Sequence, residues 1–346
     1  MINLDELRRH IESGHITDRK HPDADLYIYN YTAKTQYDRV WNQITLVCRG
    51  LILDSDGTIV ARPFGKFFNL SDHPAETIPN EPFEVFEKFD GSLGILYFIG
   101  DEPAIATRGA FASPQAIRGT EILRREIAKT LSTDQREALR DPEVTHLFEI
   151  VYPENRIVVD YGGEEKLVHL ATIDKRTGLD VPIRDLGFPR APMLQWGDDL
   201  HNLAGNGTEN AEGYVVRFRS GLRVKVKLAE YLRLHKLLTG ISEKKIWEHL
   251  RDELGVEPLL ERVPDEFNTW VREIVERLQR DYAAIESEAL ADFKTFPTRK
   301  ETAEYILTRP HPKVLFSILT GKDYRRAIWN LIEPKFTRPF KGANDE

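Results

Sequence analysis

The hydrophobic pattern of the chain changes near residue 230, and this change limits the folds that the sequence can adopt. Before it, short runs rich in β-branched and aromatic residues are separated by turn signals such as Ser55-Asp56-Gly57 and Asp90-Gly91, a pattern typical of hairpin-connected strands. After it, apolar residues recur at helical spacing. We therefore expect an α+β fold, with a mostly antiparallel sheet domain over residues 1–235 and an all-α domain over 236–346.

The expected elements follow from these local patterns. One helix interrupts the strands of the first domain after Ser113, a favourable N-cap residue, with Pro114 in its first turn. In the second domain, we predict helices at 242–255, from Pro264 onward, and at 299–308, 313–320 and 324–332. In the first domain, we predict strands at 26–32, 45–54, 58–63, 83–88, 92–98, 103–107, 146–151, 156–160, 166–173, 213–218 and 222–227.

The bulk composition is that of an ordinary globular protein, since 41% of the 346 residues are apolar and 30% are charged. No apolar run is long enough to span a bilayer, and the first fifteen residues lack the apolar stretch of a signal peptide. The single cysteine, Cys48, excludes an internal disulfide framework and a multi-cysteine zinc site. We therefore expect a cytoplasmic protein without a membrane partner, with a monomer as the default expectation.

The formal net charge of −8 argues against a protein held on nucleic acid by its overall charge. A local basic groove is nevertheless enough to contact phosphates. Such a bias occurs from residue 217 to residue 236, and it is either a solvated face or an anion-binding groove. Against the single acid Glu230, this run contains Arg217, Arg219, Arg223, Lys225, Lys227, Arg233 and Lys236.

A lysine at the end of an apolar strand is the first candidate for chemistry. Lys88 directly precedes the tight turn at Asp90-Gly91. On this stretch alone, a solvated lysine of a surface hairpin is the favoured interpretation. A lysine attacks phosphorus only as the neutral amine, which neighbouring cations and partial burial favour.

Two further stretches place charges in or beside strands. Glu212-Gly213 precedes a strand, and Lys225 and Lys227 share one face of the next strand because side chains alternate. The two ammonium groups repel each other unless an anion such as a nucleotide phosphate lies between them, although a charged outer face of an edge strand would also explain them. Glu149 stands in an otherwise apolar strand, where it needs a partner, a metal ion or an exposed edge position.

The order of these motifs resembles the covalent nucleotidyltransferases, the superfamily of DNA ligases, RNA ligases and mRNA capping enzymes. Lys-x-Asp-Gly begins at Lys88, the buried acid is Glu149, Glu-Gly-x-Val begins at Glu212, and Lys-x-Lys follows. Within the superfamily, the upstream segments at 48–54 and 61–69 are similar to the bacteriophage T4 RNA ligase 1 family. The resemblance covers roughly residues 25–230 and implies an ATP-grasp-like nucleotidyltransferase domain.

The resemblance also implies a role for each matching residue. Lys88 would be the nucleophile that carries AMP, and Glu149 and Glu212 would bind a Mg²⁺ or Mn²⁺ ion. Arg108 stands where the family usually has a lysine, so its hydrogen-bond geometry differs although its charge is kept. The residues implied in binding the ATP nucleotide are Arg49, Lys66, Phe68, Glu87, Asp90, Gly91, Arg108, Glu149, Glu212, Gly213, Lys225 and Lys227.

The implied activity is that of an ATP-dependent RNA ligase, which joins a 3′-hydroxyl to a 5′-phosphate RNA end through lysyl–AMP and RNA-adenylate intermediates. A broken tRNA is the substrate that the family suggests. A DNA ligase or a GTP-dependent capping enzyme is an alternative, but both usually carry an OB-fold where helices are expected here. A catalytically inactive RNA-binding module is the alternative of another class, and the presence of the nucleophile, both acids and both motif lysines argues against it.

The helical domain is expected to help choose the RNA. Aromatic residues at 270, 282 and 329 lie at helical spacing among other apolar residues, which favours packing in a core over stacking on bases. The candidates for contacts with the RNA backbone are Arg325, Arg326, Lys335 and Arg338.

Overall fold

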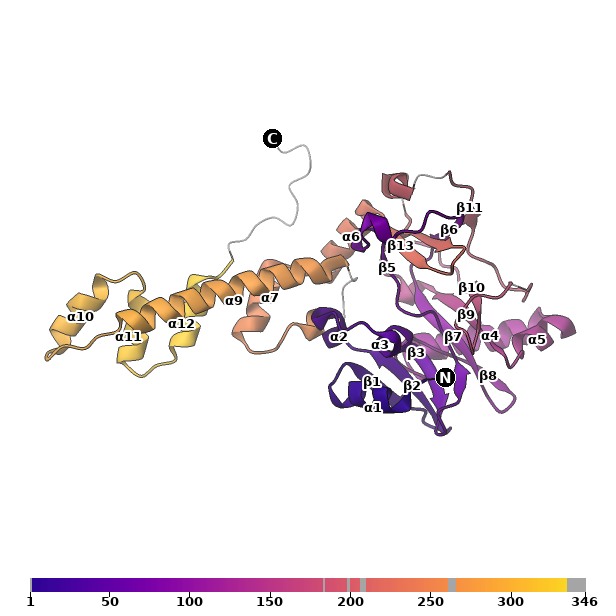
Figure 1. The fold of residues 1–346 in the computed structure, drawn as a ribbon, viewed down its shortest axis with the longest axis horizontal. Helices are drawn as coiled ribbons and strands as arrows, with labels where there is room; N and C mark the ends of the chain where they lie inside the picture. The colour runs from indigo at the N-terminus through magenta and orange to yellow at the C-terminus, as the bar shows by residue number, and fades with distance from the viewer. Residues whose placement is uncertain (1, 183, 198–199, 206–209, 261–265, 335–346) are drawn as a thin grey trace. The chain divides into compact units, whose positions relative to one another are not determined.

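The chain forms two compact units, residues 1–235 and 236–346 (Figure 1). The first contains β-sheets with flanking helices, and the second contains helices in its described part. The expected α+β fold, mostly antiparallel and followed by helices, is confirmed. Lys335 and Arg338 lie outside the described residues. The computed structural model describes residues 2–182, 184–197, 200–205, 210–260 and 266–334.

The described part of the first unit contains three sheets, with strand orders β1-β2-β3-β4, β10-β9-β7-β8 and β11-β6-β12-β13-β5. Their described pairings are antiparallel except that of β13 with β5. The strands are β1 Ile16–Lys20, β2 Leu26–Tyr31, β3 Arg49–Asp54, β4 Ile59–Ala61, β5 Phe68–Asn69, β6 Phe83–Lys88, β7 Ser92–Ile99, β8 Glu102–Ala106, β9 Val144–Val151, β10 Lys166–Asp174, β11 Met193–Leu194, β12 Gly213–Phe218 and β13 Arg223–Lys227.

Layered packing explains why the first two of these sheets are apolar on both faces. The β1–β4 sheet packs against the β10-β9-β7-β8 sheet through residues such as Ile28, Ile52, Ile95 and Leu147. The outer face of each sheet is covered by helices, so the strands read as nearly continuous apolar runs. These helices are α1 Leu4–Glu12, α3 Gln43–Val47, α4 Pro114–Lys129 and α5 Thr133–Leu139, whereas helix α2 Ala33–Asp38 follows strand β2.

The third sheet meets the second at one tight turn. Strand β6 ends at Lys88 in the third sheet, and β7 begins at Ser92 in the second. Gly213 of β12 pairs with Lys88, and Glu149 of β9 pairs with Leu93 of β7. The junction of the two sheets therefore brings the lysine, the Glu212-Gly213 motif and the buried acid to one place, although they are far apart in sequence.

Two predicted strands differ from the structure, one for a local reason and one for a tertiary reason. Residues 45–47 are helical instead of extended, because Asn42 caps helix α3 with a reciprocal capping box. Residues 156–160 form no strand. They follow a short 3₁₀ turn at Pro153–Asn155, and the backbone N–H groups of Val158 and Val159 donate to a carboxylate at Asp90 instead of to a neighbouring strand.

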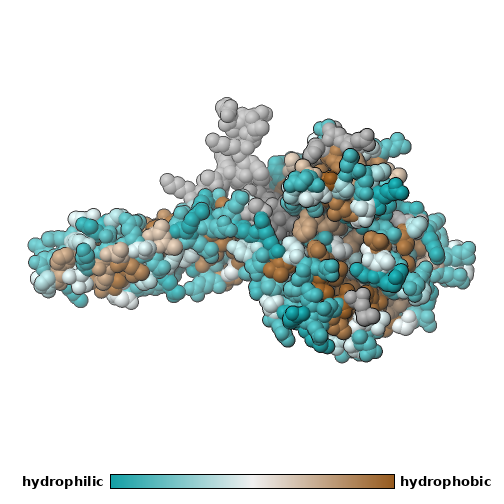
Figure 2. Space-filling view, in the orientation of Figure 1, coloured by the Kyte–Doolittle hydropathy of each residue, from teal (hydrophilic) through white to brown (hydrophobic). Residues whose placement is uncertain are grey.

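The helices of the second unit pack around aliphatic residues such as Ile306, Val314, Leu315 and Ile328. Tyr282 joins this cluster and contacts Trp329 with ring centroids 5.0 Å apart, as expected for core packing. Apolar surface also remains exposed, for example at Leu307. Figure 2 shows apolar residues, in brown, among hydrophilic ones at the surface. No described helix is long and apolar enough to cross a membrane. The later helices are α6 Ala229–Thr239, which crosses the unit boundary, α7 Glu243–Arg251, α8 Glu257–Leu260, α9 Glu266–Asp292, α10 Arg299–Leu307, α11 Pro312–Leu319 and α12 Tyr324–Leu331.

Candidate active site

A carboxylate bridges two of the predicted site lysines. Lys88 Nζ donates to Glu212 Oε2 at 2.7 Å, and Lys227 Nζ lies 3.1 Å from Glu212 Oε1. The side chain of Glu212 is 4% exposed, and that of Lys88 is 23% exposed. Lys88 is therefore reachable from solvent, while the groups that hold it are enclosed. Lys227 is a cation near Lys88, as expected, but the acid Glu212 contacts Lys88 directly.

The charge of Glu212 is stabilised by these lysines. Burial by itself raises the pKa of this carboxyl, but Lys88 and Lys227 outweigh burial and hold the pKa below its ordinary value. Glu212 is thus ionised at neutral pH, and both of its oxygens are engaged by cations. Removing it would leave two ammonium groups close together without a counter-charge.

Glu149 is in the opposite electrostatic situation. Burial raises the pKa of its carboxyl to about 7, and the attraction of Lys88 only partly offsets burial. Within the described part of the chain, no hydrogen bond or ion pair reaches this carboxylate. Its side chain lies against Gly91, where an added Cβ would be 3.1 Å from Glu149 Cγ. A buried acid of this kind, beside the candidate nucleophile, is a group that a cation would stabilise.

Asp90 holds the surrounding backbone in place. Its Oδ2 accepts from the N–H groups of Val158 and Val159 at 2.7 and 2.8 Å, and its Oδ1 accepts from the Tyr231 hydroxyl at 2.8 Å. Its own N–H donates to the Tyr161 hydroxyl at 2.7 Å. The carboxylate of Asp90 therefore ties the turn after Lys88 to a distant loop and to helix α6.

The glycine of the second motif has a steric role. Gly213 has φ +148°, and a Cβ there would lie 2.0 Å from the carbonyl oxygen of Val226. A glycine is therefore required for β12 to pair closely with β13. That pairing sets Gly213 opposite both Lys88 and Lys227.

The lysines of β13 occupy one face of that strand, as alternation predicts, and Lys225 is 7% exposed. The same face continues to Arg223, which pairs with Asp180, as does Arg217 of β12. Ion pairs thus engage part of the basic run of residues 217–236. Its lysine end adjoins the candidate site, and its arginine end is linked to acids.

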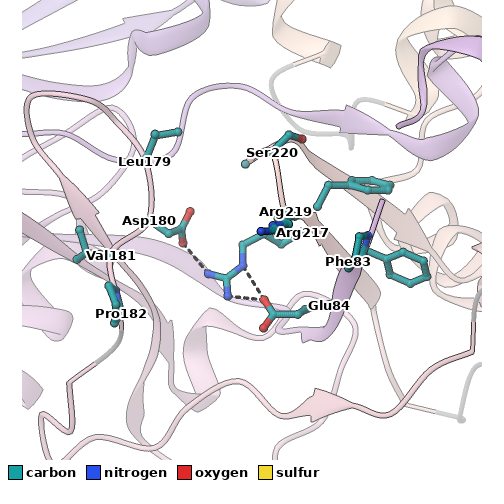
Figure 3. A pocket seen from close by; sticks show the side chains of 12 residues that line it. Phe83, Glu84, Leu179, Asp180, Val181, Pro182, Arg217, Arg219 and Ser220 are labelled. Carbon is teal, nitrogen blue, oxygen red and sulfur yellow. Dashed lines mark hydrogen bonds and ion pairs between the residues drawn. The ribbon is translucent and has the colours of Figure 1, made fainter. Parts of the chain in front are cut away.

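The arginine end lines a cavity of about 530 Å³ at the other end of β12 (Figure 3). Figure 3 shows Arg217 reaching between Asp180 and Glu84. Since Lys88 pairs with the first residue of β12 and Phe83 pairs with the last, the two ends are roughly 16 Å apart along the strand. The cavity is therefore separate from the candidate nucleophile.

The predicted upstream residues form a second group. Lys66 Nζ lies over the rings of Tyr31, Trp41 and Phe68, between 5.4 and 5.6 Å from their centroids. The Arg108 guanidinium lies over Tyr31 at 5.3 Å. Edge strand β5 connects this group to strand β13, because Phe68 pairs with Val224 and Asn69 pairs with Lys225.

Arg49 and Glu87 are two further residues predicted to bind the nucleotide. Arg49 is placed over the Phe67 ring, 5.8 Å from its centroid, and its charge acts on Glu149. Glu87 precedes Lys88 on β6, so its side chain points to the other face of the strand. The structure therefore does not bring the Glu87 carboxylate to Lys88, and burial raises its pKa.

Sequence reasoning missed several residues that shape the site. Tyr161 and Tyr231 fix Asp90, and Tyr31 and Trp41 enclose Lys66. Tyr231 lies four residues after the Lys-x-Lys motif, a position that could have suggested a role. Trp41 lies in the connection between two short helices, and no pattern in the sequence singles it out.

Comparisons with known proteins find similar sequences that are described as RNA ligases. Residues 47–181 match the model of a protein family described as RNA ligase. A Thermovibrio ammonificans protein provisionally named as an RNA ligase is 30% identical over 256 residues, covering 69% of this chain and 65% of the relative. An RNA ligase of Rhodothermus phage RM378 is 25% identical, covering 84% of this chain and 80% of the relative.

Solved structures resemble the chain more distantly. An archaeal ATP-dependent RNA ligase has a TM-score of 0.48 and 15% identity, covering 88% of this chain and 86% of that one. Among the relatives, the chain spans just under two thirds of the Thermovibrio protein's length.

Proposed function

The chain belongs to the RNA ligase family, and we propose from this that it is an ATP-dependent RNA ligase that carries AMP on Lys88. Its substrates are RNA ends, one with a 3′-hydroxyl and the other with a 5′-phosphate. One observation supports this proposal above the others: Lys88 is a partly exposed amine held beside Glu212 and Lys227, at the junction of two sheets. That arrangement suits a nucleophile facing a polyphosphate.

The reaction proceeds by three in-line phosphoryl transfers. The neutral Lys88 amine attacks the α-phosphorus of ATP, so that a P–N bond forms and the bond to the pyrophosphate oxygen breaks. The 5′-phosphate of the RNA then takes the AMP from Lys88. Finally, the 3′-hydroxyl attacks the adenylated phosphate, forms the phosphodiester and releases AMP. Negative charge spreads over phosphoryl oxygens in each step, and we assign its stabilisation to Lys225, Lys227 and Lys66.

A divalent ion fits the acid that burial penalises. We assign Glu149 as the main ligand of Mg²⁺ or Mn²⁺, because its carboxyl is buried and no described residue pairs with it. Glu212 is the second candidate, although two lysines engage its oxygens. Within the described ranges, no group of three or more acids, histidines or cysteines is arranged to hold a metal ion by itself. Mg²⁺ commonly uses one or two carboxylates with waters and phosphates, and the bound ion would neutralise phosphate charge.

Covalent labelling tests the proposal. The full chain, incubated with α-labelled ATP and Mg²⁺, should retain label after denaturing electrophoresis, and Lys88→Ala should retain none. Lys166→Ala is a control that should keep the label, because Lys166 begins strand β10 and pairs with Glu164. Label retained by Lys88→Ala would show that the AMP is carried elsewhere.

Nucleotide and substrate choice separate the alternatives. Labelling by GTP and not by ATP would indicate capping-type chemistry, and joining of nicked DNA but not RNA would indicate a DNA ligase. No labelling of the folded wild-type chain by either nucleotide would indicate an inactive RNA-binding protein. Recognition of RNA requires contacts with the 2′-hydroxyl or with A-form shape.

We also propose that the helical unit selects the RNA and that the enzyme works as a cytoplasmic monomer. Arg325 and Arg326 of α12 remain candidates for RNA contacts, although Arg325 also pairs with Asp323 and Glu253. Arg326→Gln should weaken RNA joining at low substrate concentration and leave labelling of Lys88 by ATP intact. Equal losses in both assays would contradict this division of roles, and sedimentation as a dimer would contradict the monomer.

A further inference from the structure

A partly exposed aromatic ring lies on the helical unit, in the loop that joins helix α9 to helix α10 (Figure 1). Phe296 in this loop is 42% exposed. Its ring contacts the ring of Tyr305 in α10, with centroids 5.2 Å apart and an interplanar angle of 53°. The Arg309 guanidinium lies over the Tyr305 ring, 4.6 Å from its centroid. We call Phe296, Tyr305 and Arg309 the ring platform.

Hydrogen bonds hold the loop of the platform in place. The hydroxyl oxygen of Thr302, a buried residue, accepts from the Phe296 N–H at 2.9 Å. The Tyr305 hydroxyl donates to the carbonyl oxygen of the last residue of α9 at 2.9 Å. Thr298 caps the start of α10 through a reciprocal capping box with Glu301. The exposed ring of Phe296 is therefore positioned in advance, so a ligand that contacts it does not have to order the loop.

The segment that carries the platform is basic, although the whole chain has a formal net charge of −8. Residues 294–313 contain two acids, and the structure engages both: Glu301 belongs to the capping box, and Glu304 lies 4.0 Å from Lys300. The cations of the segment are Lys294, Arg299, Lys300, Arg309 and Lys313. The platform therefore belongs to a segment with a local excess of positive charge.

Three of these cations lie close to the Phe296 ring along the chain or through the platform. Lys294 is two residues before Phe296 and Arg299 is three residues after it, so their Cα atoms lie within about 11 Å of that of Phe296. Among the described residues, no acid forms an ion pair with Lys294, Arg299 or Arg309, and Arg309 donates instead to a neighbouring threonine hydroxyl. Arg325 of α12, by contrast, pairs with two acids. The three cations of the loop and platform are thus better suited than Arg325 to bind phosphate groups.

The surface around Phe296 suits a nucleic acid strand better than a protein. Each residue from 294 to 300 is exposed, and apart from Phe296 and Pro297 all of them are polar or charged. A surface that docks a protein normally offers a contiguous apolar patch, whereas proteins that hold single strands combine aromatic rings for the bases with cations for the backbone. Bases in a duplex stack on each other, so a ring of this kind requires an unpaired base.

We propose that the ring platform binds single-stranded RNA, with an unpaired base stacked on Phe296 and the flanking phosphates contacted by Lys294, Arg299 and Arg309. This inference rests on the proposed function, in which the helical unit selects the RNA. It places the contact in the loop between α9 and α10 and gives it a chemistry, because a ring accepts an unpaired base of any sequence. The helical unit therefore favours RNA whose broken ends lie in single-stranded regions.

Binding of RNA to the full chain, without ATP, tests the proposal. The probes are a single-stranded oligoadenylate of about twelve nucleotides and a blunt RNA duplex of the same length, followed by fluorescence anisotropy at several salt concentrations. Phe296→Leu removes the ring but keeps apolar bulk, so the Kd of the single strand should rise about tenfold. The Kd of the duplex should change by less than about twofold. Phe296→Trp should bind the single strand at least as tightly as wild type.

Salt dependence separates stacking from charge. Phe296→Leu loses no charge, so the slope of log Kd against log salt concentration should stay unchanged, whereas Arg309→Gln should lower this slope by about 0.7. Leu307→Ala is the matched control, because Leu307 is 66% exposed on the same helix but lies two residues after Tyr305, on the other side of the helix. Leu307→Ala should leave the Kd of both probes unchanged.

The result for Phe296→Leu decides the proposal. An unchanged Kd of the single strand would overturn it and would leave a protein as the partner of this surface. Equal weakening of both probes, or the same loss in Leu307→Ala, would overturn it as well. Equal Tm values of wild type and Phe296→Leu would show that the variant folds. Should it not fold, Phe296→Met replaces it, because methionine fills space without a ring face.

Failure of the proposed function would give a different result. The binding assay requires neither ATP nor Lys88, so a wild-type chain that never acquires AMP would end the ligase proposal and leave the test of the platform intact. A chain that acquires AMP on Lys88, and in which Phe296→Leu binds the single strand as tightly as wild type, would overturn the platform alone. A wild-type chain that binds neither probe would also overturn the platform.

Discussion

Two buried histidines should make the first unit sensitive to acid. His146 of β9 and His169 of β10 share the Thr172 hydroxyl, at 3.0 and 3.2 Å. His146 Nε2 also contacts the Ala138 carbonyl oxygen at 3.0 Å, and His169 Nε2 contacts that of Ala171 at 3.1 Å. These contacts are all satisfied when both rings are neutral, with Nε2–H donating and Thr172 donating to His146 Nδ1. A second proton on His169 would lie on Nδ1, which is buried and has no hydrogen-bond partner among the described residues.

The size of the effect follows from the pKa of His169, which burial and the neighbouring His146 lower to about 3. Burial lowers the pKa of His146 as well. The ordinary value is about 6.5, so between pH 6.5 and pH 3 the unfolded chain binds more protons than the folded one. The free energy of unfolding therefore falls as pH falls through this window. For His169 alone, the loss between pH 7.5 and pH 5 is about 2 kcal/mol.

His169→Gln tests this reasoning, because glutamine keeps an N–H donor but does not titrate in this range. Urea unfolding would be followed by hydrogen-exchange labelling of β9 and β10 in the full chain at pH 7.5 and pH 5. The difference at pH 7.5 reports the packing cost of the substitution. Between pH 7.5 and pH 5, the variant should lose about 2 kcal/mol less stability than wild type. An identical loss in both chains would refute the assignment of acid sensitivity to His169.

Three further predictions concern residues around the site. Without divalent ions at pH 8, the free energy of unfolding of Glu149→Gln in urea should exceed that of wild type by up to about 3 kcal/mol. The pKa of Glu149 is about 7, so the buried carboxylate costs stability once pH exceeds the ordinary pKa of a glutamate. The gain should vanish at pH 4.5 and RNA joining should be lost, whereas a gain independent of pH would contradict the assignment. Gly213→Ala should cost at least about 3 kcal/mol, since its Cβ would meet the Val226 carbonyl oxygen; a normally stable, active protein would be inconsistent with the close approach of β12 to β13. Asp180→Ala should lower the free energy of unfolding by about 2 kcal/mol in thermal unfolding, because it leaves Arg217 and Arg223 facing each other. An unchanged Tm would show that the ion pairs of Asp180 with these arginines contribute little.

Much of the fold could be predicted from local patterns, because turns and strand alternation are local properties. The strands carrying Lys88, Glu149 and Lys225 were predicted near their observed positions. The strands on either side of Asp90-Gly91 form no hairpin, however, because β6 and β7 belong to different sheets. The segment 156–160 could not be predicted, because its backbone donors go to Asp90, far away in sequence. Only the tertiary structure shows that this carboxylate replaces a neighbouring strand.

The site was predictable as a set of residues but not as a geometry. Motif order alone identified Lys88, Glu149 and Glu212, yet it did not show that Glu212 would bridge Lys88 and Lys227. Nor did it show that Glu149 would lack such a partner among the described residues. Trp41 was invisible because a ring-face contact with an ammonium group requires no particular sequence spacing.

The hydrogen bonds of Asp90 bear on how mutational scans of this protein should be interpreted. Its carboxylate anchors Val158, Val159 and helix α6, so replacing it by alanine would release two backbone donors and the Tyr231 hydroxyl together. An inactive Asp90→Ala enzyme would then say nothing about whether this residue meets the nucleotide. For this residue, inactivation and chemical participation are separate questions, and a scan that scores only joined product will confuse them.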